Sequence, residues 1–241
     1  MLTERWAPAA KRWLPASTIV RLRCLLRSKP RPHWGNLRRT TPFSTCHGFD
    51  RGTPVDRFYL HRFLGEHRHL ITGDVLEVQV DSYTRRFGHD LRKADTFDII
   101  TDFRPTYLCD LAHSEGVLPS AGYDCIVLPN TLPHLRELDS CLHHLLRVVR
   151  PGGVILASAG GFIPLTADVP DYWRLSPDGW RELLQRVWSE AVVEVMGHGN
   201  CLAAVAALYG LALEELAEHE LEAHDPRYPV LTTIVCRKAR Q

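Results

Sequence analysis

The chain has 241 residues, of which 45% are hydrophobic and 24% are charged, and its formal net charge is +1. This composition is typical of a globular protein that can bury a sizeable core, so it excludes a fully disordered chain, a collagen-like fibre and a mini-protein stapled by disulfides. The longest apolar run, residues 202–213, is too short to span a bilayer.

The first part of the chain is strongly basic. Residues 1–45 hold ten basic residues and one acid, so we expect a basic N-terminal arm over residues 1–45 and a folded domain over residues 46–241. The arm could contact nucleic acid or an acidic membrane surface, but a charge run is more often solvated surface or a strap over the body. We therefore expect no nucleic-acid partner and no membrane span.

The cysteines and histidines indicate neither a disulfide framework nor a metal site. The seven cysteines include no CxxC pair, which favours reduced thiols and a cytoplasmic location. We expect no signal peptide, because Arg21 and Arg23 interrupt the apolar stretch of residues 14–26. The thirteen histidines lack the ligand spacings of a zinc site, so no protein-bound metal is expected.

The first half of the folded domain reads as strands and helices in alternation. A helix is expected over residues 55–67, with Thr53 as its N-cap and Pro54 at its first position. Helical spacing of apolar residues predicts a second helix over residues 137–149, which ends at a basic turn and a Pro-Gly-Gly sequence. Short apolar runs predict strands at 74–78, 96–100, 106–109, 124–128 and 154–157.

The last part of the chain has a different pattern. Strands are expected at residues 192–196 and 231–235, and a long helix over residues 202–221 lies between them. The Ala-rich stretch of residues 202–212, with Tyr209, is expected to be core helix, because small and apolar residues suit close packing.

Strands that read as continuous apolar runs and alternate with helices predict a parallel sheet covered on both faces. In open sheets of this kind, ligands bind beyond the carboxyl ends of the strands. The residues at those ends are polar and rich in acids; they are residues 79–88, 101–102, 110–111 and 130–134.

Several stretches carry a resemblance to a known family. They are residues 49–59, 75–78, 83–88, 123–126, 146–153, 171–174 and 199–204. The most specific are Arg51-Gly52-Thr53-Pro54-Val55-Asp56-Arg57 and Tyr83-Thr84-Arg85-Arg86-Phe87-Gly88. From about Phe49 to Arg237, the chain resembles a class I S-adenosylmethionine-dependent methyltransferase, of a bacterial branch associated with glycosyl transfer and natural-product pathways.

The resemblance implies an α/β fold with a Rossmann-like, seven-stranded sheet, mostly parallel with one antiparallel strand, and helices on both faces. It also implies S-adenosyl-L-methionine as the cofactor and a small molecule as the methyl acceptor, and it leaves the oligomeric state open. The sequence departs from the family where three glycines usually follow the first strand, because Gln79, Asp81 and Tyr83 stand there. If Gln79 has a positive φ, its side chain costs about 1 kcal/mol.

By the same resemblance, residues after the first four strands would bind the cofactor. A carboxylate can accept hydrogen bonds from both ribose hydroxyls, and Asp102, or otherwise Asp98, would have this role. The remaining candidates are Arg51 for the methionine carboxylate, Glu77, Gln79 and Tyr83 in the first turn, Asp110 and Leu111 for the adenine, and Asn130 and Thr131 for the methionine side.

His134 follows the fourth strand and is our first candidate for the base that deprotonates an acceptor hydroxyl. Asp171 is the second catalytic candidate. The candidates for the acceptor wall are Tyr59, Tyr172, Trp173 and Arg174. A capping histidine and a packed loop are the alternative interpretations of these residues.

The expected activity is O-methylation of a secondary metabolite or a sugar-bearing natural product. Two alternatives stay open from the sequence. The fold could be repurposed for a cyclisation or elimination, with His134 and Asp171 as acid and base, or it could serve as a non-catalytic binding scaffold.

Overall fold

The computed structural model describes residues 15, 17–18, 33–166, 169–189 and 191–240. The chain divides into two compact units, Met1–Thr40 and Thr41–Gln241. Most of the predicted basic arm, residues 1–45, lies outside the described residues; the first unit contributes a short 3₁₀ helix, η1 (Gly35–Leu37). Everything that follows concerns the second unit.

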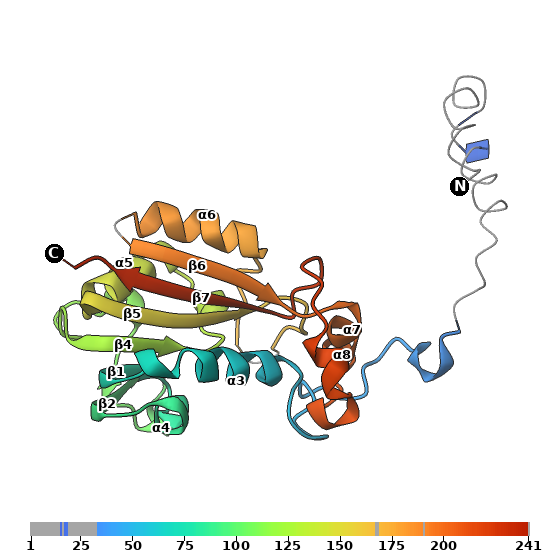
Figure 1. Cartoon of the computed structure of the whole chain (residues 1–241), viewed down its shortest axis with the longest axis horizontal. Helices are drawn as coiled ribbons and strands as arrows, with labels where there is room; N and C mark the ends of the chain where they lie inside the picture. Colours follow the sequence, from blue (N-terminus) through green and yellow to red (C-terminus); the bar gives the residue numbers. More distant parts are fainter. Residues whose placement is uncertain (1–14, 16, 19–32, 167–168, 190, 241) are drawn as a thin grey trace. The chain divides into compact units, whose positions relative to one another are not determined.

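One mixed sheet forms the centre of the second unit (Figure 1). Within the described residues it has seven strands, in the order β3-β2-β1-β4-β5-β7-β6. Strand β7 runs antiparallel to both of its neighbours, and the paired strands from β3 to β5 are parallel. The prediction of a mostly parallel sheet with one antiparallel strand is therefore confirmed. The strands are β1 (Gly73–Val78), β2 (Leu91–Asp98), β3 (Tyr107–Leu108), β4 (Tyr123–Leu128), β5 (Val149–Gly160), β6 (Ala191–His198) and β7 (Leu231–Lys238).

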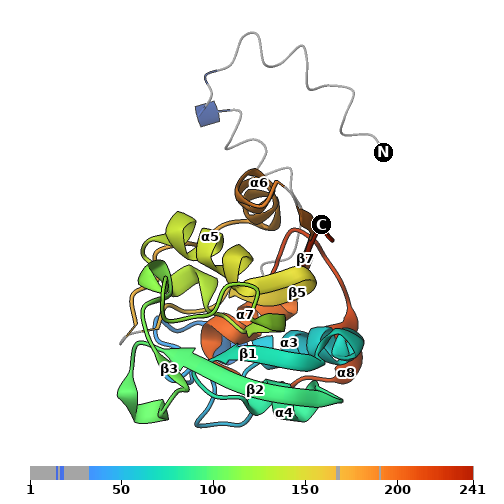
Figure 2. The same cartoon turned by 90° about the vertical axis from the view of Figure 1, so that its left-hand side faces the viewer.

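Helices cover both faces of the sheet (Figure 2). They are α3 (Asp56–Glu66), α4 (Ser82–Phe87), α5 (Leu138–Val148), α6 (Pro177–Val187), α7 (Cys201–Tyr209) and α8 (Glu218–Glu222). Short 3₁₀ helices join them: η2 (Arg68–Leu70), η3 (Thr101–Phe103), η4 (Leu111–His113), η5 (Leu132–His134) and η6 (Leu213–Glu215). In the described part of the chain, no helix is long and apolar enough to cross a membrane.

Alternate residues of each central strand supply two separate cores, because successive side chains of a strand point to opposite faces. Leu76 and Ile126 pack on the side of α5 and α6, together with the buried Trp180. Val75 and Cys125 pack on the side of α3 and α7. Continuous apolar strands are thus explained by burial on both faces.

The predicted long helix over residues 202–221 is wrong. Helix α7 ends at Gly210, which has a left-handed φ of +67°, and α8 begins only at Glu218. A Cβ at Gly210 would lie 2.7 Å from the carbonyl oxygen of Ser44, so the close approach of that segment requires glycine and breaks the helix. The Ala-rich part of α7 is buried, as expected.

Other element boundaries also differ from the predictions. The first predicted helix begins at Asp56 rather than at Pro54, because Pro54 pairs with Ala212 and the Thr53 hydroxyl donates to Glu214 (2.7 Å) instead of capping. The second strand ends at Asp98, so residues 99–100 lie beyond it. Helices α4 and α6 were not predicted.

Four charged residues tie the amino ends of four parallel strands together. Asp124 Oδ2 accepts from the guanidinium groups of Arg92 (2.5 Å) and Arg150 (2.7 Å) and from the backbone N–H of Asp74 (2.9 Å). Arg150 also donates to the Asp74 carboxylate (2.7 Å). These bonds connect β1, β2, β4 and β5 at the end of the sheet opposite the carboxyl ends, where ligands bind in such folds.

We expect Asp124→Asn to lower the free energy of unfolding by about 1 kcal/mol at neutral pH, since the network is partly exposed. Partial burial alone would raise the pKa of Asp124, but the Asp74 N–H, Arg150 and Arg92 hold it below its ordinary value of 3.8. A lowered carboxylate pKa gives stability that is present above pH 4 and is lost as the pH falls through the folded-state pKa. Urea unfolding between pH 2 and pH 7 measures this.

The matched control for Asp124 is Asp102→Asn, because Asp102 is exposed and makes no ion pair among the described residues. The two variants should differ in stability at pH 7 and converge at pH 2. Equal stability at pH 7 would contradict a stabilising role for the network.

Candidate functional site

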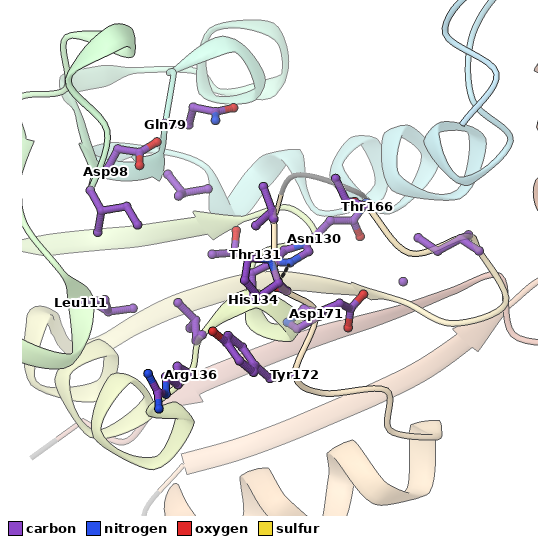
Figure 3. A pocket seen from close by; sticks show the side chains of 18 of the residues that line it. Gln79, Asp98, Leu111, Asn130, Thr131, His134, Arg136, Thr166, Asp171 and Tyr172 are labelled. Carbon is purple, nitrogen blue, oxygen red and sulfur yellow. Dashed lines mark hydrogen bonds between the residues drawn. The ribbon is translucent and has the colours of Figure 1, made fainter. Parts of the chain in front are cut away.

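A cavity of about 800 Å³ opens at the carboxyl ends of the parallel strands. Its volume is in the range of small-molecule sites. Gln79 follows β1, Asp98 ends β2 and Asn130 follows β4, and all three line the cavity. In Figure 3, Gln79, Asp98 and Leu111 lie on one side and His134 and Asp171 lie on the other.

Three residues of the cavity wall have left-handed backbone conformations that side chains disfavour: His47 (φ +58°), Gln79 and Asn130. Gln79 has a φ of +67° and Asn130 a φ of +50°. Asn130 is held by its neighbours: its N–H donates to Ser158 Oγ (2.9 Å), and its side-chain amide donates to Asp56 Oδ2 (2.8 Å). Strain of this kind costs about 1–3 kcal/mol per residue and tends to gather at functional sites.

Glu77 is a buried carboxylate directly before the first turn, and it is 1% exposed. It accepts hydrogen bonds from the backbone N–H groups of Tyr83 (3.1 Å) and Thr84 (2.7 Å) at the start of α4. Burial raises the pKa of Glu77 to about 7, against the opposing effect of these N–H donors. Glu77 therefore stabilises the turn between β1 and α4 through these two hydrogen bonds.

Tyr83 does not line the cavity. Its ring lies against Phe87 and His61, on the side of the turn that faces α3. Gln79 does line the cavity, so of the residues at the three glycine positions it is the one whose side chain borders the space for a ligand.

Among the candidates for ribose and adenine, the structure brings Asp98, Asp110 and Leu111 to the cavity wall. Asp102 is not one of the lining residues; it lies on the exposed η3. The difference follows from the early end of β2, which leaves Asp98 as the last residue of the strand. Asp110 Oδ1 accepts from the N–H of Ala112 (2.9 Å) and caps η4.

Arg51 lies away from the cavity wall, where its guanidinium binds Glu215 through two hydrogen bonds. Arg57 lines the cavity instead, next to Asp56, with which it forms an ion pair (2.9 Å). Sequence reasoning missed both residues of this pair. The signal that could have found them is two adjacent, opposite charges at the start of the helix that precedes the first strand.

His134 and Thr131 line the cavity just after β4. His134 Nδ1 lies 2.8 Å from the carbonyl oxygen of Pro170. A carbonyl oxygen can only accept, so Nδ1 carries the proton, and Nε2 of the neutral ring has a free lone pair. His134 therefore has the tautomer that a general base requires.

Asp171, Tyr172 and Arg174 also line the cavity, whereas Trp173 and Tyr59 do not. Trp173 Nε1 donates to the carbonyl of Leu135 (2.7 Å). The Tyr59 hydroxyl donates to the carbonyl of Leu221 (3.0 Å), and burial raises the pKa of Tyr59 to about 12. Trp173 and Tyr59 are therefore packing residues in this structure.

No protein-family model and no curated protein matches the sequence. The structure is similar to that of an S-adenosylmethionine-dependent methyltransferase from Mesorhizobium loti, with a TM-score of 0.51 and 14% identity over 79% of this chain and 100% of that chain. A structure from Listeria monocytogenes assigned to the same class has a TM-score of 0.52 and 9% identity over 77% of this chain and 97% of that chain. These similarities establish the fold, which is the Rossmann-like class I methyltransferase sheet that the sequence predicts.

The raised pKa of Glu77 predicts a pH-dependent loss of stability. A carboxyl with a folded-state pKa of about 7 and an ordinary value of 4.5 destabilises the fold as the pH rises between these values, because the unfolded chain loses its proton first. Relative to Glu77→Gln, the unaltered protein should lose about 3 kcal/mol of unfolding free energy between pH 4 and pH 8. Urea unfolding at pH 4, 6 and 8 measures the difference.

Glu182→Gln is the control, since Glu182 is exposed on α6. It should follow the unaltered protein at every pH. Parallel pH profiles for Glu77→Gln and the unaltered protein would show that Glu77 does not titrate in this range.

Proposed function

We propose that the chain is an S-adenosylmethionine-dependent methyltransferase that acts on a hydroxyl group of a small molecule, such as a secondary metabolite or a sugar-bearing natural product. The observation that supports this most is the pairing of two features in one cavity. Asp98 and Asp110 lie at the carboxyl ends of strands on one side of the cavity, and His134, whose Nε2 is free to accept a proton, lies on the other side.

The residues present fit this cofactor. Asp98 would accept hydrogen bonds from the ribose hydroxyls, and Asp110 with the Leu111 backbone would contact the adenine. Asp56 and Arg57 would face the ammonium and carboxylate groups of the methionine part, because a guanidinium fork matches a carboxylate. In this proposal Asp98 replaces Asp102, and Arg57 replaces Arg51.

The middle of the cavity would receive the methionine chain. Asn130 and Thr131 line it on the β4 side, and Gln79 lines it on the β1 side. Asn130 cannot turn away, because its side-chain amide is bonded to both Asp56 and Ser158. The Gln79 side chain is exposed in the cavity and narrows it without closing it.

When bound, the cofactor would supply a methyl carbon to the acceptor oxygen, and the carbon–sulfur bond would break as the carbon–oxygen bond forms. His134 Nε2 would take the proton of the acceptor hydroxyl. The Pro170 carbonyl holds the imidazole in the required tautomer and stabilises the charge that it gains. Asp171 would not act as this base, since its carboxylate is paired with Arg174.

Replacing the base tests the chemistry. We expect His134→Ala to lower kcat by about 10²–10⁴-fold, the usual contribution of general-base catalysis, and to leave the affinity for S-adenosylhomocysteine within about two-fold. His143→Ala is the matched control, because His143 Nδ1 also bonds a carbonyl oxygen (Asp139, 2.7 Å) but lies on the exposed face of α5. Equal rates for the two variants would contradict the role of His134.

Replacing Gln79 by glycine tests the cofactor site. We expect Gln79→Gly to bind S-adenosylhomocysteine about ten-fold more tightly, because it removes a side chain from the cavity wall. The relief of about 1 kcal/mol of backbone strain is common to the free and the bound chain, so it should change the free energy of unfolding and not the affinity. Asp90→Gly is the control, since Asp90 has a φ of +47° but does not line the cavity. Calorimetry of the variants measures both affinities.

The unaltered chain should itself bind S-adenosylhomocysteine in the same calorimetric experiment. No heat of binding at millimolar ligand would contradict the proposed function. Binding without methyl transfer to any acceptor would favour the alternative of a repurposed fold.

A further inference from the structure

The Asp171 carboxylate is buried with one of its oxygens unsatisfied. Its side chain is 4% exposed, and Oδ2 accepts from Arg174 Nε (2.8 Å) and Nη2. Oδ1 has no hydrogen-bond partner among the residues that the structure describes. An unpaired acceptor of this kind is costly, more so when it is charged, so a specific reason for it is expected.

Arg174 cannot supply the missing bond, because its other donors are already used. Nη1 donates to the carbonyls of Gly161 (2.8 Å) and Ile163 (3.1 Å), and Nη2 donates to Pro164 (3.2 Å) as well as to Asp171. A guanidinium has five N–H groups, and these contacts, together with that of Nε, account for all five within the described residues. Arg174 thus fixes the loop and the carboxylate, and Oδ1 stays free for another donor.

This oxygen belongs to the same wall as the proposed base. Both Asp171 and His134 line the cavity, and Figure 3 shows them on the same side of it. Their segments are bonded together: His134 Nδ1 contacts the Pro170 carbonyl (2.8 Å), and the Tyr172 N–H donates to the Pro133 carbonyl (2.8 Å). A ligand that gives a proton to His134 therefore has Asp171 close beside it.

Among the other buried side-chain oxygens without a partner are those of Thr84 and Thr232, which do not line the cavity and carry no charge. Asp171 therefore differs from them in both respects. The unsatisfied, charged Oδ1 of Asp171 at the cavity wall indicates that the methyl-accepting molecule carries a second hydrogen-bond donor.

A neutral donor suits this position better than a cation. Arg174 already balances the charge of Asp171, so an ammonium group would lose its hydration without an unpaired charge to offset the loss. Arg136 lines the same cavity with its own positive charge and has no ion-pair partner in the described part of the chain.

We infer that the acceptor is a vicinal diol: one hydroxyl is the group that His134 deprotonates, and the adjacent hydroxyl donates to Asp171 Oδ1. Asp171 is then a residue that determines acceptor specificity by binding. The inference rests on the proposed function, since it names the substrate class of the same site.

Ligands that share one ring test the inference without requiring methyl transfer. The probes are cis-cyclohexane-1,2-diol, cyclohexanol and cis-2-aminocyclohexanol, titrated into the full chain and followed by ligand-observed NMR. We expect the diol to bind at least about ten-fold more tightly than cyclohexanol, the usual effect of one hydrogen bond to a charged group. The amino alcohol should bind more weakly than the diol.

Asp171→Asn should abolish the preference for the diol. Asp178→Asn is the matched control, because Asp178 forms the same i,i+3 pair with Arg181 but is exposed and outside the cavity. If Asp171→Asn does not fold, the three ligands on the unaltered chain still decide the question.

Equal affinities for diol and cyclohexanol, or no detectable binding of the diol, would overturn the inference and leave a bound water as the partner of Oδ1. Tightest binding of the amino alcohol would overturn the assignment to a hydroxyl. A diol preference that survives in Asp171→Asn would overturn the role of Asp171. Calorimetry with S-adenosylhomocysteine on the same preparation separates these outcomes from failure of the proposed function, because it probes the cofactor side alone.

Discussion

The buried carboxylate of Glu77 is the interaction on which the shape of the cavity depends. The first N–H groups of a helix have no partner within the helix, and Glu77 satisfies those of Tyr83 and Thr84. These bonds anchor α4 behind the end of β1, so the chain between them must turn sharply, and Gln79 takes the left-handed conformation that glycine usually occupies. The turn is therefore held by hydrogen bonds to a buried carboxylate, and not by glycines at the three positions where the family usually has them.

A second polar network fixes the opposite side of the same opening. Asn130, after β4, bonds Ser158 in β5 and Asp56 at the start of α3. The network joins elements that are distant in the sequence, and it places the Asp56–Arg57 pair at the rim of the cavity. Gln79 and Asn130, two of the strained residues of the wall, are thus held by hydrogen bonds of their own or of their neighbours, which keeps the opening rigid before any ligand arrives.

The sequence predicts the sheet well, because strands buried on both faces must be continuously apolar. It predicts the site less well, because site residues depend on element ends and distant partners. Asp98 rather than Asp102 lines the cavity because β2 ends two residues earlier than its apolar run. Arg51 is held away from the cavity by its hydrogen bonds to Glu215, which lies 164 positions further along the chain. No local sequence pattern reveals such a pair.

The wall formed by residues 161–166 and 169–174 has several backbone carbonyls bonded to Arg174 and one carboxylate oxygen without a partner. Arg174 uses its donors on backbone carbonyls of the loop and on Asp171 Oδ2, and two acceptors remain at the cavity: Asp171 Oδ1 and, from the neighbouring segment, His134 Nε2. Two such acceptors discriminate strongly, because a ligand without matching donors leaves them unpaired. Specificity at this site would then arise from acceptors that the described residues leave without a partner, and the loop that Arg174 holds in place keeps Asp171 Oδ1 among them.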